Sequence, residues 1–315
     1  MSWKTLGAVS PSELVDARLQ LHHAAQLVAS AGVSFLEPQP DDSHPNFGWV
    51  ESLGALVGRS LPGAGAQVGL RVADLSLLIV DENGQASEEL ALDGKTLEDG
   101  YAWLASATTR AGATLPAGGL TRAGYEIPSH ATGCGAPFSS ASRDAFAELA
   151  RWFSNGYHAL AELAARTSGA SGVRCWPHHF DLGALAVVGT HPDGRLAKSI
   201  GLGLSPGDES FAEPYWYVSP WPYPEASGLP ALEGAGFWHT DGFTSAVLIG
   251  SELVGGPPES QADRLSAFLE GVGEQPRGRG NLTPYWHVDG VELAQDHRVE
   301  VDLDGRLLGC NAGVI

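Results

Sequence analysis

A hairpin signal at residues 83–84 constrains the fold of this chain more than any other feature. The segment VGLRVADLSLLIVDENGQASEELAL, residues 68–92, alternates apolar and polar residues at a spacing of two, and Asn83-Gly84 interrupts it. This dipeptide is typical of the tight turn between two antiparallel strands. We therefore expect two strands joined at this turn, within an antiparallel sheet.

Helical periodicity elsewhere predicts the elements that cover this sheet. Apolar residues recur three and four positions apart in residues 12–31, 96–112, 142–166 and 259–271, with Ser12 and Thr96 as N-caps, and YEIP at 125–128 reads as a short strand. These elements predict an α+β fold, in which mixed or antiparallel sheets pack against a few amphipathic helices. We assign residues 1–276 to one α+β domain, with 1–140 and 141–276 as its two halves if it divides, and residues 277–315 to a C-terminal extension with short strands.

Charge and composition restrict the partners of the chain. Lys plus Arg is 18 against 37 Asp plus Glu, which gives a net charge of −19 that would repel nucleic acid and anionic membranes. The first residues carry no apolar segment of the secretory type, and no apolar run reaches the length of a membrane span, so we expect a cytoplasmic protein. A small-molecule substrate or ligand is the expected partner, and the oligomeric state stays open.

Two His-x-Asp pairs stand out between residues 173 and 241. His179 precedes Asp181, and His239 precedes Asp241, by two positions. In a strand such a pair projects from one face, where it suits metal binding or a carboxylate that orients an imidazole. This pattern puts His178 on the other, more apolar side.

A metal site is the first hypothesis for these pairs. If their strands are neighbours, His179 and His239, with His178 as a further candidate ligand, would bind Zn²⁺, Mn²⁺ or Fe²⁺. Asp181, Glu209 and Asp241 are the catalytic candidates, as carboxylate ligand or general base. The hypothesis is a metal-dependent hydrolase of a small ester, phosphoester or amide.

Aromatic residues in the same stretch predict a substrate pocket. Trp176, Tyr215, Tyr217 and Trp238 are candidates for its wall. The prolines in EPYWYVSPWPYPE each remove a backbone donor, so we do not expect a regular central strand there.

Three alternatives stay open. His239, Asp241 and His297, followed by Arg306, are similar to the facial triad and cosubstrate arginine of the iron- and 2-oxoglutarate-dependent oxygenases, although Arg306-Leu307-Leu308 departs from that family's Arg-x-Ser. The histidines could instead be structural, in a non-catalytic small-molecule-binding or interaction protein. Cys134 with His130, four residues earlier, is a conceivable catalytic pair.

The order of several motifs resembles an uncharacterised bacterial protein family of unknown function. The matching text is LQLHHAAQL, RVADLSLLIVDENGQ, TLEDGYAWL, YEIP, HHFDLGALAV and EPYWYVSPWPYPE, within residues 19–225. The resemblance implies an α+β architecture and a cytoplasmic bacterial protein. It supplies no catalytic residue, and residues after 276 lie outside it.

Overall fold

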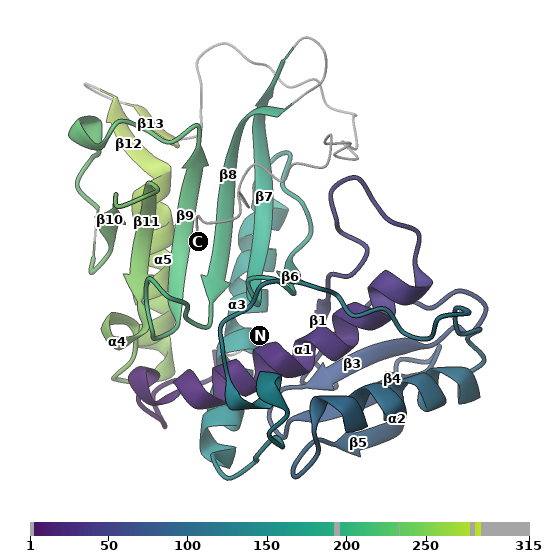
Figure 1. Ribbon diagram of the computed structural model, residues 1–315. Helices are drawn as coiled ribbons and strands as arrows, with labels where there is room; N and C mark the ends of the chain where they lie inside the picture. Colours follow the sequence, from purple (N-terminus) through teal and green to yellow (C-terminus); the bar gives the residue numbers. More distant parts are fainter. Residues whose placement is uncertain (1–2, 192–195, 233, 278–280, 285–315) are drawn as a thin grey trace.

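Antiparallel sheets carry the fold of this chain. The computed structural model describes residues 3–191, 196–232, 234–277 and 281–284 (Figure 1). Strands pair in the orders β1-β2-β3-β4-β5 and β10-β11-β9-β8-β7-β6, and β12 pairs with β13. Helices pack against both larger sheets, so the predicted α+β fold is confirmed.

The smaller of the two main sheets contains the predicted hairpin. Its strands are β1 (Gly48–Val50), β2 (Ala55–Val57), β3 (Gln67–Arg71), β4 (Ser76–Val80) and β5 (Ala86–Ala91). At the β4–β5 turn Asp81 N donates to Gln85 O at 2.8 Å, and Gly84 takes a φ of 74°, a conformation that glycine adopts without strain. The segment forms three strands and not the expected two, because residues 72–75 turn between β3 and β4.

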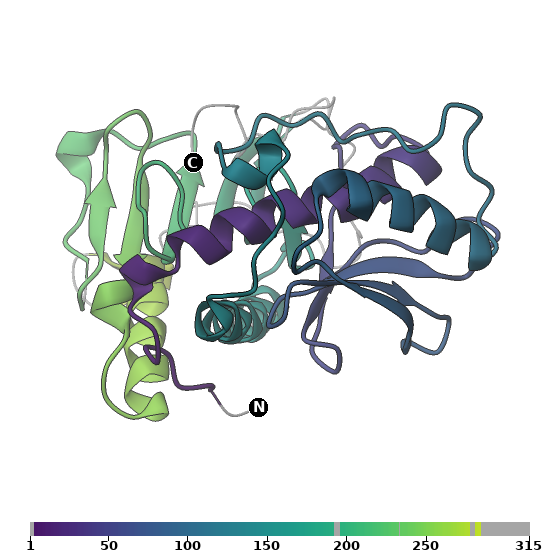
Figure 2. The same cartoon turned by 60° about the horizontal axis from the view of Figure 1, so that its bottom comes forward.

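Two helices cover this sheet. They are α1 (Val15–Phe35) and α2 (Leu97–Arg110), which contact each other (Figure 2). Helix α1 also contacts β3, and α2 also contacts β4. Thr96 and Asp99 form the capping box of α2, as its sequence indicates. Ser12 is not the N-cap of α1, because a 3-10 turn, η1 (Pro11–Glu13), comes first and Leu14 takes the cap position.

The larger sheet contains most of the predicted site stretch. Its strands are β6 (Arg174–Trp176), β7 (Asp181–Thr190), β8 (Leu196–Ser205), β9 (Tyr215–Trp221), β10 (Phe237–His239) and β11 (Ser245–Ile249). Helix α3 (Arg143–Arg166) packs on β7 and β8, where Gly156 leaves room for the side chains of Leu182 and Leu204. The remaining elements are η2 (Ala131–Cys134), η3 (Ala226–Gly228), α4 (Gly250–Leu253), α5 (Pro258–Gly273), β12 (Glu274–Arg277) and β13 (Asn281–Pro284).

Two predicted features of the backbone are wrong. YEIP is not a strand, and its Tyr125 instead donates a hydrogen bond to Asp42 at 2.8 Å. Tyr215–Trp221 is a central strand in spite of Pro220, because β11 pairs with β9 only as far as Val218. Pro220 therefore has a paired neighbour on one side only, where a missing backbone donor is tolerated.

One continuous hydrophobic core joins the two main sheets. Its buried residues come from α1, from β3 and β4 of the smaller sheet, from α3, and from β7, β8 and β9 of the larger sheet. The predicted apolar stripe of α3 contributes Phe146, Leu149, Phe153 and Leu160, each at most 1% exposed. Among the described residues no helix is long and apolar enough to cross a membrane. Most of the C-terminal extension predicted at residues 277–315 lies outside the described residues.

Candidate functional site

A row of polar side chains crosses one end of the larger sheet. Ser205 on β8 pairs with Tyr215 on β9, and the pairing of Leu182 with Leu204 places Asp181 on β7 beside Ser205. Neighbouring residues such as Leu182 and Leu204 point into the main core, so the row faces the opposite side of the sheet. We call Asp181, Ser205 and Tyr215 the Asp181 row.

Tyr217, two residues after Tyr215 on β9, also contacts this row. Its hydroxyl donates a hydrogen bond of 2.5 Å to Oδ2 of Asp181. The ring crosses β8 at Gly203, where a Cβ atom would overlap it, and the hydroxyl would lie 3.3 Å from a Cβ at Gly183. The two glycines therefore provide the flat surface over which Tyr217 reaches the carboxyl group.

Burial dominates the electrostatic environment of Asp181. The residue is 5% exposed, and its second oxygen, Oδ1, is buried without a hydrogen-bond partner among the described residues. Burial raises the pKa of Asp181, while His179 and the hydrogen bond from Tyr217 act in the opposite direction. An unsatisfied oxygen on a buried carboxyl group is costly, and such groups are concentrated at functional sites.

The β8–β9 loop supplies a second carboxylate. Oδ1 of Asp208 accepts hydrogen bonds from the backbone N of Ser210 at 2.7 Å and of Phe211 at 3.0 Å, and Oδ2 accepts one from the Tyr215 hydroxyl. Burial and Asp208 together raise the pKa of Tyr215 well above its usual value. Tyr215 is thus a neutral donor that fixes Asp208 toward its own loop.

Helix α1 brings Arg18 and His22, one turn apart, to this end of the sheet. Nε2 of His22 donates to the carbonyl oxygen of Pro177 at 3.0 Å, and its ring stacks on Phe180 with 5.3 Å between centroids. Burial is the main cause that lowers the pKa of His22 to about 3, so its ring is neutral near neutral pH. Arg18 is 7% exposed and interacts electrostatically with Asp208 and Tyr215.

The predicted strand positions of His178 and His179 are wrong. Residues 177–180 form a turn between β6 and β7, with Phe180 at a φ of 59°, so the strand alternation does not apply to them. The centroids of the two imidazole rings lie 4.3 Å apart, and the ring centroids of Trp176 and His178 lie 6.1 Å apart. Burial lowers the pKa of His178 to about 4. His179 stays close enough to Asp181 to affect its pKa.

The second His-x-Asp pair lies far from the first. Strands β8, β9 and β11 separate β7 from β10, a span of roughly 19 Å at about 4.8 Å per strand step. The assumption that the two strands are neighbours is therefore wrong, and His179 and His239 cannot share one metal ion in this arrangement. Among the described residues, no group of three or more His, Cys, Asp or Glu side chains could hold a metal ion.

His239 has partners of its own. Its Nε2 lies 2.8 Å from the carbonyl oxygen of Asp241. The centroid of its ring lies 5.5 Å from that of Phe211 and 4.3 Å from that of Phe243. Asp241 and Glu209 are both exposed and belong to different loops.

The remaining predicted site residues have separate environments. Trp238 donates to the carbonyl oxygen of Pro230 at 2.8 Å, away from the other predicted pocket residues. His130 contacts Thr132 at 2.9 Å and Asp16 at 3.2 Å, and the exposed Cys134 is the last residue of η2. His297 and Arg306 of the oxygenase alternative lie outside the described residues.

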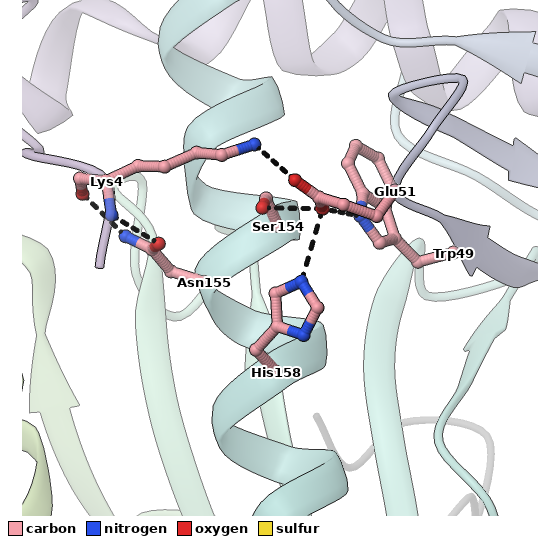
Figure 3. A network of polar contacts seen from close by, with 6 residues as sticks. All are labelled: Lys4, Trp49, Glu51, Ser154, Asn155 and His158. Atoms are coloured by element: carbon pink, nitrogen blue, oxygen red, sulfur yellow. Dashed lines mark hydrogen bonds and ion pairs between the residues drawn. The ribbon is translucent and has the colours of Figure 1, made fainter. Parts of the chain in front are cut away.

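A second polar network surrounds Glu51, which directly follows β1, and includes Ser154 and His158 of α3 (Figure 3). Its carboxylate accepts from Lys4 at 2.7 Å, Trp49 at 2.7 Å and Ser154 at 2.8 Å, with His158 at 3.3 Å. Burial alone would raise the pKa of Glu51, but these hydrogen bonds outweigh it and lower the pKa to about 2. Both carboxylate oxygens accept hydrogen bonds, so Glu51 holds the N-terminal segment to α3.

Sequence reasoning found part of the Asp181 cluster, which we define as the Asp181 row with Tyr217, Asp208, Arg18, His22 and His179. It named Asp181, Tyr215, Tyr217 and His179 as site candidates but not the other four members, Arg18, His22, Ser205 and Asp208. The available signal was the pair Arg18 and His22 in α1, whose spacing of four places both on one side of the helix. No protein-family model, curated protein or solved structure matches the chain.

Proposed function

We propose that the chain is an enzyme that acts on a small polar molecule at the Asp181 cluster, with Asp181 as general acid and base. Hydrolysis of a small ester or amide is the reaction class that we favour. One observation carries the proposal: Asp181 is almost fully buried, Tyr217 holds one of its oxygens at 2.5 Å, and the other oxygen has no partner within the described part of the chain.

The raised pKa of Asp181 supports this role. A carboxyl group in a low-dielectric environment keeps its proton at higher pH than it does in water, and it can then donate that proton to a leaving group. Tyr217 fixes the orientation of the carboxyl group through Oδ2. Oδ1 is therefore the atom that would deliver or accept the proton.

The metal ligands predicted from the sequence do not support a common site. His179 and His239 lie on opposite sides of β8, β9 and β11, so we derive no catalytic step through a metal ion. His179 instead supports the proposal as a nearby group that opposes the rise in the pKa of Asp181.

A panel of chromogenic esters and anilides of small acids tests the proposal. Asp181→Asn keeps the size of the side chain but cannot exchange the proton, and removal of a general acid typically costs about 100- to 10,000-fold in rate. Asp241→Asn is the matched control, because Asp241 is exposed and far from the cluster. We expect turnover to fall at least about 100-fold in Asp181→Asn and to change by no more than about twofold in Asp241→Asn.

Two results would contradict the proposal. One is turnover that survives in Asp181→Asn, and the other is a substrate that the Asp241 variant loses to the same extent. A non-catalytic binding protein is the second candidate, because Tyr215, Tyr217 and Asp181 are all buried. For that function, the wild-type chain would bind small ligands but turn over none of the panel.

A further inference from the structure

Arg18 is a buried cation whose guanidinium group forms no ion pair with another residue that the structure describes. It is 7% exposed, its Nε is buried without a hydrogen bond, and among the described residues no carboxylate oxygen within 4.0 Å pairs with its guanidinium group. Other buried or half-buried arginines differ from it, since Arg151 pairs with Glu148 and Arg264 donates to three carbonyl oxygens. A buried charge without a partner is unfavourable unless an anion compensates it.

The nearest carboxylate is committed elsewhere. Asp208 influences Arg18 electrostatically, but its Oδ1 accepts two backbone N–H groups and its Oδ2 accepts the Tyr215 hydroxyl. These bonds fix Asp208 toward its own loop. Nε of Arg18 has no hydrogen-bond partner among the described residues, and a bidentate acceptor would meet the in-plane N–H edge of the guanidinium group.

Arg18 and Asp181 share the same surroundings. Both interact electrostatically with Asp208 and with Tyr215. The first turns of α1, which carry Arg18, lie below the ends of β8 and β9 in Figure 1. Two buried side chains with unused hydrogen-bonding atoms, one cationic and one a carboxyl group, therefore lie at one end of the larger sheet.

We propose that Arg18 binds the carboxylate of a small organic acid derivative, whose reacting group then lies toward Oδ1 of Asp181. This inference rests on the proposed function, because it names the substrate class of the same site. Guanidinium and carboxylate are both planar, and their paired hydrogen bonds give affinity and orientation together. The carboxylate would thus hold the substrate in a fixed direction relative to Asp181.

The charge around the site favours a monoanion. Asp208 is close to Arg18, and Asp181 is close to Asp208. A second negative charge on the ligand would be repelled by these groups, whereas one negative charge is balanced by Arg18. We therefore expect acetate, glycolate and benzoate to bind better than inorganic phosphate.

Thermal-shift and calorimetric titrations with these four anions test the inference. Arg18→Met keeps the length and apolar stem of the side chain without its charge, and Arg18→Lys keeps the charge without the planar fork. Arg110→Met is the control, because Arg110 forms an exposed ion pair with Glu88. We expect the affinity for the monocarboxylates to fall roughly 10- to 100-fold in Arg18→Met, by a smaller factor in Arg18→Lys, and to stay unchanged in Arg110→Met.

The melting temperature without ligand gives a second readout. Because Arg18→Met removes an unpaired buried charge, we expect the variant to melt at a higher temperature than wild type in anion-free buffer. If Arg18→Met does not fold, the affinity of Arg18→Lys for the monocarboxylates tests the inference by itself. Carboxylate binding that is equal in wild type and in both Arg18 variants, or phosphate binding that exceeds carboxylate binding, would overturn the inference.

The outcomes separate this inference from the proposed function. If Arg18 variants lose carboxylate binding while Asp181→Asn retains turnover, the ligand class stands and the role of Asp181 falls. If Asp181→Asn loses turnover while carboxylates bind the Arg18 variants normally, the acid–base role stands and the ligand class is wrong.

Discussion

Replacement of Gly203 by alanine tests how the sheet positions Tyr217. A Cβ atom at residue 203 would overlap the Tyr217 ring, so the ring must move and its hydroxyl must leave Asp181. Overpacking costs about 1–3 kcal/mol and a buried group left unsatisfied costs about 1–3 kcal/mol, against a gain of about 0.5–1 kcal/mol from replacing glycine in a strand. The expected net loss in the free energy of unfolding is about 1–5.5 kcal/mol.

Gly201→Ala provides the matched control for this change. Gly201 lies on the same strand and face, two residues away, but a Cβ there would meet only Ser219, at 3.7 and 3.8 Å. Urea unfolding of both variants, monitored by tryptophan fluorescence, gives the comparison. We expect Gly201→Ala to be neutral or slightly stabilising. Equal stability of the two alanine variants would refute the packing of Tyr217 over Gly203 and, with it, the geometry of the site.

Three further predictions concern the pH dependence of stability and use the melting temperature as a function of pH. Burial raises the folded-state pKa of Asp181, so the contribution of its protonated carboxyl group to stability is complete below about pH 3.9 and is lost as pH rises through the raised pKa. Asp181→Asn should therefore be more stable than wild type at pH 8. The opposite order at pH 8 would contradict the burial of an ionisable carboxyl group. His22 has a folded-state pKa lowered to about 3, so wild type should lose about 3 kcal/mol relative to His22→Gln between pH 7 and pH 4, and parallel curves would be inconsistent with this. Glu51 has a pKa lowered to about 2, so its ionised form stabilises the fold above about pH 4.5 and this stabilisation disappears as pH falls toward 2. At pH 7, Glu51→Gln should be less stable than wild type by about 1–3 kcal/mol. The two proteins should become equally stable in acid.

Local sequence signals predicted the elements whose stability is local. The capping residues of α2 and the apolar stripe of α3 are encoded within single helices, and the Asn83-Gly84 turn specifies the β4–β5 hairpin. The hidden 3-10 turn at Pro11–Glu13 and the turn at residues 177–180 left no comparable signal. Elements were therefore easier to predict than their boundaries.

Contacts between distant segments were the part that sequence reasoning could not supply. The order of strands in the larger sheet decides whether His179 meets His239, and chain order gives no rule for placing β8, β9 and β11 between them. Arg18 interacts electrostatically with Asp208, although almost two hundred residues of sequence separate them. The bond between Tyr217 and Asp181 depends on a glycine of a third strand, which no local pattern reveals.

A carbon-13 NMR titration of the Asp181 carboxyl group tests the proposed site most directly. The signal is assigned by its absence in Asp181→Asn, and its shift is followed from pH 3 to pH 9. We predict a pKa clearly above the usual value of about 3.9, and a further change when a monocarboxylate that binds Arg18 is added. A midpoint at or below about 3.9 that no ligand changes would contradict the role of Asp181 as a proton-transfer group.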